Sequence, residues 1–241
     1  MAGEPTNHVQ GDAPMPEMAR YLKCTEFVDC DTKSVAEKAE ALTEGLQTDR
    51  EKAVALYYFV RDEIRHNAYA ALYDPDHYKA SVILEAGNGI CQQKSILLCA
   101  LARAAGIPAR LGFVDVNDYQ LSESFKQMIG GINVFPFHGF AELFVDGRWV
   151  HASPAYDLET CRRKRFIPVD FDGVNDAKDS QYTEEGEPHI EHLEYHGPYE
   201  DFPWDEILSY YKEWAARLGI DWDELKDAGE QVRRRKSWGD G

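Results

Sequence analysis

A glycine turn runs directly into an apolar helix pattern at residues 87–110, which read GNGICQQKSILLCALARAAGIPAR. The two glycines allow a sharp turn, and the Leu- and Ala-rich residues 91–105 predict a helix. Gly106 ends that helix, and residues 108–116 then predict a strand. Cys91 therefore lies in the first turn of a helix, where unpaired N–H groups and the helix dipole stabilise a thiolate.

The segments on either side of this helix predict further elements. Upstream, residues 34–46 and 48–65 predict amphipathic helices, and the second opens on a Thr-Asp-Arg-Glu capping box. Downstream, residues 138–145 and 148–152 alternate as two strands joined by an Asp-Gly hairpin turn. We therefore expect an α+β fold in which the helix carrying Cys91 packs on an antiparallel sheet.

The remaining segments suggest the domain organisation. Residues 1–16 predict a flexible N-terminal arm, and residues 17–160 predict the catalytic domain. Residues 161–241 read as an acidic C-terminal extension that is turn-rich over 170–203. It ends with a helix packed on the same domain, predicted at 205–218. The long connection at residues 117–137 is typical of a lid or a cleft wall.

Composition excludes several classes of protein. The 241 residues contain 26 Lys and Arg against 43 Asp and Glu, which gives a net charge of −17. Such acidity argues against a nucleic-acid partner and against binding to an anionic membrane surface. The longest strongly apolar stretch, residues 96–102, is far too short to span a bilayer. The N-terminal residues lack a basic start followed by an apolar run, so they do not predict a signal peptide.

The five cysteines do not suggest a disulfide framework, because their number is odd and their spacing is scattered. The sequence contains no Cys-x-x-Cys pair, so a structural zinc site is not expected. We therefore expect a cytoplasmic protein with reduced cysteines, one of which is a candidate for chemistry.

A nucleophilic thiol needs a base and a group that orients the base. His138 begins the first strand of the predicted hairpin, and Asp157 follows the second strand. On a sheet packed against the helix of Cys91, all three side chains could meet at one edge. Each residue taken alone is more often structural, so the hypothesis depends on the surrounding sequence.

That surrounding sequence resembles the core of the transglutaminase-like superfamily. The resemblance is carried by residues 89–94 (GICQQK), 97–110 (LLCALARAAGIPAR) and 138–150 (HGFAELFVDGRWV), and it covers roughly residues 50–160. It implies a papain-like α+β fold with a Cys-His-Asp triad. Cys91 matches the nucleophile of the family and His138 matches the base.

The third member of the triad departs from the common pattern. Many relatives carry an aspartate directly before the proline that follows the tryptophan strand, and here that position is Ser153. Asp157 is the nearest carboxylate downstream. It resembles the Thr-Pro-Ala-Phe-Asn or Asp string of some bacterial-type members, so we expect Asp157 to orient His138. Without such a group the imidazole tautomer is unspecified and activity should be low.

Further polar residues are candidates for the site. The backbone N–H of Cys91 is a natural oxyanion donor, and Asn88 or Gln92 could supply a second one. Lys94 could help to hold an anion, although a solvated or salt-bridged lysine is the simpler interpretation. On a helix, His189, His192 and His196 would share a face that a divalent metal could use, but the simpler interpretation is a polar segment packed on the catalytic domain.

The resemblance implies acyl transfer or hydrolysis at an amide, either a glutamine side chain or a peptide bond, through a thioester. Protease or amidase activity is as plausible as crosslinking in a compact chain. We expect a protein or peptide substrate, no cofactor and no metal, while the oligomeric state stays open. The alternative is a catalytically inactive transglutaminase-like binding or scaffold module, which the presence of Cys91 and His138 disfavours.

Overall fold

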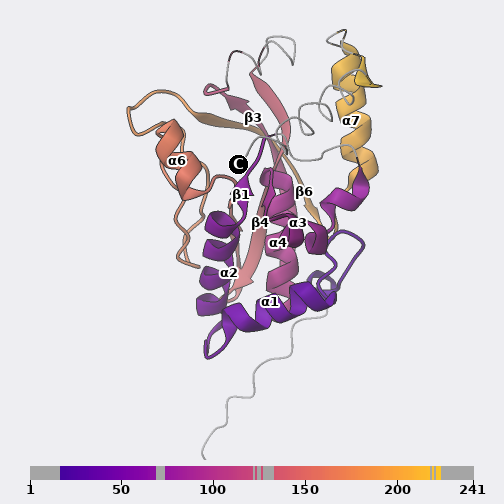
Figure 1. Ribbon diagram of the computed structural model, residues 1–241, viewed down its shortest axis with the longest axis vertical. Helices are drawn as coiled ribbons and strands as arrows, with labels where there is room; N and C mark the ends of the chain where they lie inside the picture. The colour runs from indigo at the N-terminus through magenta and orange to yellow at the C-terminus, as the bar shows by residue number, and fades with distance from the viewer. Residues whose placement is uncertain are drawn as a thin grey trace, which may run out of the picture.

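The sheet and the helix of Cys91 define the architecture. The computed structural model describes residues 17–68, 74–121, 123, 126, 133–217, 219 and 221–223, so the expected arm at residues 1–16 lies outside the described part. Helix α4 (Cys91–Ala104) packs on an antiparallel sheet whose strand order is β5-β4-β3-β6 (Figure 1). The expected α+β fold is confirmed.

The strands divide into two sheets. The antiparallel sheet consists of β3 (Ala109–Asp118), β4 (Val134–Val145), β5 (Arg148–Ala152) and β6 (Ile190–Tyr199). A separate parallel pair consists of β1 (Arg65–His66) and β2 (Asn88–Gly89). The pair β1–β2 matters for the site because β2 leads directly into the first residue of α4.

Helix α4 is the centre of the core because it is buried on all sides. Every residue from Cys91 to Arg103 is buried. Three helices surround it, namely α1 (Lys33–Thr43), α2 (Asp49–Glu63) and α3 (Ala80–Ala86) (Figure 1). The other helices whose bounds fall in the described ranges are η1 (Met18–Leu22), η2 (Pro75–Tyr78), α6 (Leu158–Lys164) and α7 (Trp204–Arg217). The predicted C-terminal helix is therefore present as α7.

Local signals placed two of these elements correctly. The capping box of α2 is present, since Thr48 Oγ1 accepts from the Glu51 N–H at 3.2 Å and Glu51 Oε2 accepts from the Thr48 N–H at 2.9 Å. The hairpin turn between β4 and β5 has left-handed backbone at both residues, with φ of +51° at Asp146 and +81° at Gly147. A two-residue turn of this kind matches the twist of the two strands.

Strand β6 corrects the sequence prediction for residues 170–203. That segment was expected to be irregular, yet its last part is a ten-residue strand at the edge of the sheet, paired with β3. Its alternation is weak because only Ile190 is buried in it. The C-terminal extension is therefore part of the same sheet as the strand that carries His138.

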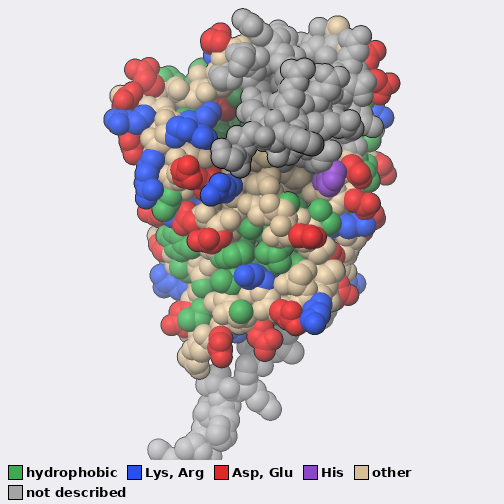
Figure 2. All heavy atoms as spheres, viewed as in Figure 1, with side chains coloured by type: hydrophobic (Ala, Val, Ile, Leu, Met, Phe, Trp, Pro, Cys, Tyr) green, Lys and Arg blue, Asp and Glu red, His purple; other side chains and the backbone are tan. Residues whose placement is uncertain are grey.

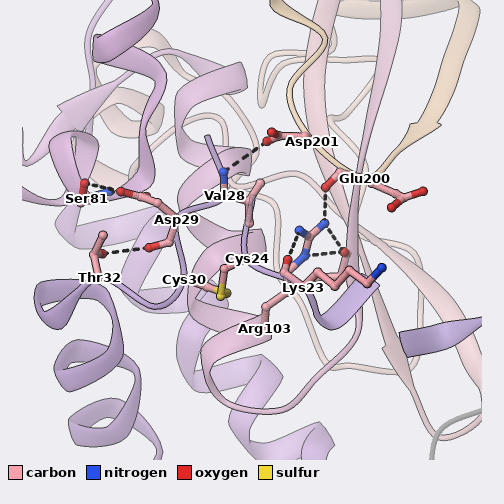
Figure 3. Close-up of a disulfide and its surroundings, with 11 residues drawn as sticks. Lys23, Cys24, Val28, Asp29, Cys30, Thr32, Ser81, Arg103, Glu200 and Asp201 are labelled. Carbon is pink, nitrogen blue, oxygen red and sulfur yellow. Dashed lines mark hydrogen bonds between the residues drawn. A yellow bond between two sulfur atoms is a disulfide. The ribbon is translucent and has the colours of Figure 1, made fainter. Parts of the chain in front are cut away.

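A disulfide corrects the expectation of free cysteines. Cys24 is joined to Cys30, and the loop between them is held to the C-terminal segment (Figure 3). Arg103 donates to the carbonyls of Lys23 at 2.7 Å and of Glu200 at 2.5 Å. Cysteine usage therefore gives no support for a reducing compartment.

The surface is mixed in charge. Figure 2 shows Asp and Glu side chains interspersed with Lys and Arg over the visible face, without a broad basic area on its described part. Among the described residues, no helix is both long enough and apolar enough to cross a bilayer.

Candidate active site

Cys91 occupies the first position of α4 because the backbone turns sharply just before it. Gly87 ends α3 in the left-handed region at φ +63°, and the extended residues of β2 follow. The Ile90 N–H donates to Gln93 Oε1 at 3.1 Å, which satisfies one donor of the helix start. The Cys91 side chain is buried, with 6% of the residue exposed. Its sulfur therefore lies at the positive end of the helix dipole, away from bulk water.

Strand β4 brings His138 to this helix start. The neighbouring Gly139 N–H donates to Cys91 Sγ at 3.5 Å. A Cβ at position 139 would lie 2.6 Å from Gln92 Cα, so only glycine permits this approach. Phe137, on the other side of His138, has φ +54° and interrupts the regular strand. These contacts place the helix start that carries Cys91 beside the part of β4 that carries His138.

Gln92, one of the two candidates for a second oxyanion donor, holds the strand that carries His138. Its Nε2 donates to the Phe137 carbonyl at 2.7 Å and to Tyr211 Oη at 3.0 Å. Tyr211, on α7, in turn donates to the Pro136 carbonyl at 3.3 Å. Both N–H bonds of the Gln92 amide are thus engaged within the protein.

The other candidate for the oxyanion hole, Asn88, is also engaged. Its Nδ2 donates to the Ala86 carbonyl at 2.8 Å, and its Oδ1 accepts from Asn67 Nδ2 at 2.9 Å. The side chain thereby stabilises the turn between α3 and α4. The N–H groups of Cys91 and Gln92 remain as donors in the first turn of α4, where no intrahelical acceptor exists.

The carboxylate beside His138 belongs to Asp179. Its Oδ2 lies 3.1 Å from His138 Nε2 and accepts from Ser153 Oγ at 2.6 Å. Because a carboxylate can only accept, Nε2 carries a proton and Nδ1 is left for the thiol. Sequence reasoning missed Asp179, which lies 41 residues beyond His138 in a segment without regular structure.

A short pairing with β5 brings Asp179 into place. The Ala177 N–H donates to the His151 carbonyl at 2.9 Å, and the Ser153 N–H donates to the Ala177 carbonyl at 3.0 Å. The Asp176 carboxylate accepts from the His151 N–H at 3.1 Å. This single parallel bridge between Ala152 and Ala177 carries the chain past Ser153, and Asp179 is buried against His138.

Asp157 has other partners, contrary to the sequence prediction. It is the N-cap of α6 and accepts from the Thr160 N–H at 2.8 Å and from Thr160 Oγ1 at 3.0 Å. It also accepts from the His66 N–H at 2.7 Å. These bonds occupy both of its oxygens, so its carboxylate stabilises the junction of β1 and α6 rather than the imidazole.

The electrostatics of the cluster favour a charged Cys–His pair. Burial alone would raise the pKa of Cys91, but the charge of His138, its hydrogen bond to the thiol and the Gly139 N–H together lower it. Burial would lower the pKa of His138, yet Cys91 and Asp179 raise it well above its usual value. Burial likewise opposes ionisation of Asp179, and the bonds from His138 and Ser153 hold its pKa far below the ordinary range.

The other free thiols have the opposite tendency. Burial raises the pKa of Cys99 to about 12 and that of Cys161 to about 11. Cys91 is therefore the one described free cysteine whose surroundings favour the thiolate.

Lys94, at the end of the first turn of α4, has a structural role. It is fully buried, and its Nζ donates to the Arg61 carbonyl near the end of α2 at 3.0 Å. Burial lowers its pKa to about 7, although Asp157 and Asp62 oppose this shift. The interpretation of Lys94 as a solvated residue is wrong.

The three histidines near the C-terminus do not form a helix-spaced set. His189 stacks on Phe166 with ring centroids 3.8 Å apart, and His196 Nε2 lies 3.0 Å from Asp115 Oδ1. His192 and His196 are on strand β6, where a spacing of four does not form the helical face assumed from the sequence. In the described ranges, no group of three or more His, Cys, Asp or Glu side chains could hold a metal ion.

Comparisons with known proteins give a family match over the part of the chain that contains Cys91 and His138. Residues 36–154 match the family model described as Transglutaminase-like superfamily. A search of curated proteins finds no significant match.

Two solved structures are similar at low identity. A candidate cysteine protease from Cytophaga hutchinsonii is 13% identical with a TM-score of 0.46, covering 79% of this chain and 61% of its own. A candidate protease from Parabacteroides distasonis is 15% identical with a TM-score of 0.38, covering 56% of this chain and 26% of its own. This chain thus spans less than two thirds of the length of either structure.

Proposed function

We propose that this chain, whose residues 36–154 belong to the transglutaminase-like superfamily, is a cysteine enzyme that cleaves or transfers amides through a thioester. The observation that carries the proposal is the buried series of contacts from the Cys91 thiol through the His138 imidazole to the Asp179 carboxylate. Its partners would be proteins or peptides that offer a glutamine side chain or a peptide bond.

In the first half-reaction, the Cys91 thiolate attacks the carbonyl carbon of the amide. The negative charge moves to the carbonyl oxygen, and the N–H groups at the start of α4 stabilise it. His138 then gives a proton to the leaving nitrogen, so that ammonia or an amine departs and a thioester on Cys91 remains.

In the second half-reaction, His138 takes a proton from the acceptor. If the acceptor is water, its oxygen attacks the thioester and releases a carboxylic acid with regeneration of the thiolate. If the acceptor is a primary amine, the product is a new amide, which is a crosslink when both partners are proteins. Access of water to the thioester decides between the two outcomes.

Asp179 is proposed as the orienting member of the triad in place of Asp157. Its bond to Nε2 fixes the tautomer that presents Nδ1 to the thiol and stabilises the imidazolium that forms. Two observations support this role over a merely structural one. Asp179 and His138 are both buried, and their contact raises the pKa of His138 and lowers that of Asp179, as expected for a charged pair.

The test is the pH dependence of alkylation of Cys91 by iodoacetamide, followed by peptide mass spectrometry in wild type and His138→Ala. We expect labelling of Cys91 in wild type well below pH 8.5, the usual thiol pKa, and a higher midpoint in the variant. Cys99 and Cys161 serve as internal controls, because their raised pKa values predict slow labelling throughout.

Substrate assays then separate the two reactions. Glutamine-containing peptides are incubated with and without a primary amine, and release of ammonia and formation of the new amide are measured. Slow labelling of Cys91 with an ordinary midpoint, unaffected by His138→Ala, would refute the enzyme and point to a binding module.

A further inference from the structure

The Asp179 carboxylate is held by a side chain that the proposed reaction does not otherwise use. Ser153 lies just beyond the end of β5, and its Oγ donates to Asp179 Oδ2 at 2.6 Å. The same oxygen faces His138 Nε2 at 3.1 Å. Both residues are buried, with 1% of Ser153 and 6% of Asp179 exposed. Ser153 and His138 therefore converge on one carboxylate oxygen away from water.

The second oxygen of Asp179 does not contribute to this arrangement. Asp179 Oδ1 is buried and has no hydrogen-bond partner among the described residues. Rotation of a carboxylate about its terminal bond is soft, so hydrogen bonds must select one orientation. The orientation of Asp179 toward the imidazole thus depends on the two donors to Oδ2.

The backbone of Ser153 is fixed independently of its hydroxyl group. Its N–H donates to the Ala177 carbonyl at 3.0 Å, and its carbonyl accepts from Tyr57 Oη at 2.8 Å. Tyr57 also donates to the Val169 carbonyl at 2.9 Å. Removal of the hydroxyl alone should therefore leave the end of β5 in place, and its effect can be attributed to Asp179.

We propose that Ser153 is a positioning residue, whose hydroxyl group fixes the Asp179 carboxylate on His138 and thereby sets the reactivity of Cys91. This inference rests on the proposed function, because it assigns a role to a residue of the same site. It also implies that a carboxylate at position 153 can reach the imidazole, since aspartate extends one atom further than serine toward the space that Asp179 Oδ2 occupies.

The titrating side chains around Asp179 must be considered in any pH measurement. His138 on β4 and His192 on β6 act on its charge. Burial lowers the pKa of His189, just before β6, to about 4, and the charge of Asp179 opposes this shift. Burial raises the pKa of Tyr156, just after β5, and the charge of Asp179 adds to that shift. None of these side chains changes in the variants proposed below, so their contribution is common to all of them.

The experiment compares wild type with Ser153→Ala, Asp179→Ser and the double variant Ser153→Asp/Asp179→Ser. The matched control is Ser81→Ala, which removes another serine-to-aspartate hydrogen bond, from Ser81 Oγ to Asp29. Each protein is measured by the pH midpoint of Cys91 alkylation, by kcat and KM on an active amide substrate, and by urea unfolding.

For Ser153→Ala we expect about a tenfold lower kcat and a higher alkylation midpoint with KM little changed, because a hydrogen bond to a charged group is lost. Asp179→Ser should lose more than Ser153→Ala. The double variant should recover at least part of the loss in Asp179→Ser, and Ser81→Ala should behave as wild type in both readouts.

The inference is overturned if Ser153→Ala keeps the wild-type midpoint and kcat, or if the double variant folds but is no better than Asp179→Ser. Should the double variant fail to fold, Ser153→Ala alone decides. A wild-type protein without a reactive Cys91 refutes the proposed function itself and the inference with it, whereas a reactive wild type with an unaffected Ser153→Ala refutes the inference alone.

Discussion

Replacement of Gly139 by alanine tests whether the close approach of β4 to α4 creates the reactive pair. An added Cβ would lie 2.6 Å from Gln92 Cα and 3.0 Å from Gln92 N. Two carbon atoms in optimal contact are about 3.5–4.0 Å apart, so the strand and the helix must separate by about 1 Å. Both atoms belong to the helix backbone and cannot rotate away as a side-chain terminus could.

This displacement sets the expected magnitude. Overpacking of a core contact costs about 1–3 kcal/mol of the free energy of unfolding. A shift of about 1 Å between reacting groups can lower a rate about 100-fold. The Gly139 N–H to Cys91 Sγ contact, at 3.5 Å, would lengthen as well. We therefore expect a higher alkylation midpoint for Cys91 together with the loss of activity.

The assay is urea unfolding combined with alkylation of Cys91 between pH 5 and 10. The matched control is Gly112→Ala on β3, where an added Cβ would overlap the ring of Phe140 on β4 rather than the start of α4. Both variants should lose stability, but only Gly139→Ala should change the alkylation profile. If Gly139→Ala is destabilised while Cys91 keeps its wild-type profile, the reasoning that this approach creates the pair is wrong.

Three further predictions follow from side chains outside the cysteine site. Asp157→Ala should cost about 0.5–2 kcal/mol of stability as a lost N-cap and leave Cys91 alkylation unchanged; a shifted alkylation profile would instead return Asp157 to the site. Burial lowers the pKa of Lys94 to about 7 in the folded chain. Above that pH the folded chain has released the Lys94 proton, whereas the unfolded chain still binds it. The free energy of unfolding should therefore rise with pH from about 7 toward 10, by at most about 1.4 kcal/mol per pH unit, and Lys94→Met should remove this dependence; equal slopes in both proteins would contradict it. Cys24→Ser/Cys30→Ser removes the disulfide and should lower the free energy of unfolding in urea by about 2 kcal/mol. An unchanged urea midpoint would show that the disulfide does not stabilise the folded chain.

Several elements could be predicted from the sequence because their signals are local. The glycine turn before Cys91, the capping box of α2 and the Asp-Gly hairpin are each specified by residues a few positions apart. A strongly apolar helix such as α4 is recognisable from its composition alone. His138 lies on the first strand of that hairpin, although β4 begins at Val134 rather than at His138 as the alternation predicted, so the approach of Cys91 and His138 could also be expected.

Strand β6 could not be predicted in the same way, because an exposed edge strand carries little alternation. The edge of β3 supplies the strand partner of Ile190–Tyr199. The pairing of Cys24 with Cys30 was likewise missed, since an odd cysteine count does not show which two lie side by side.

The polar residues of the site depended most on tertiary structure. Asp157 is close to the hairpin in sequence, yet the start of α6 and the His66 N–H occupy it. Asp179 is distant in sequence, yet the pairing of Ala177 with β5 carries it to His138. The helix start, the thiol and the imidazole are each specified by neighbouring residues, so they can be predicted without the fold. The carboxylate that reaches the imidazole is decided by tertiary structure, because it depends on contacts between segments that are distant in sequence. Backbone N–H groups of His66 and Thr160 already bind Asp157, and the pairing of Ala177 with β5 leaves Asp179 beside His138.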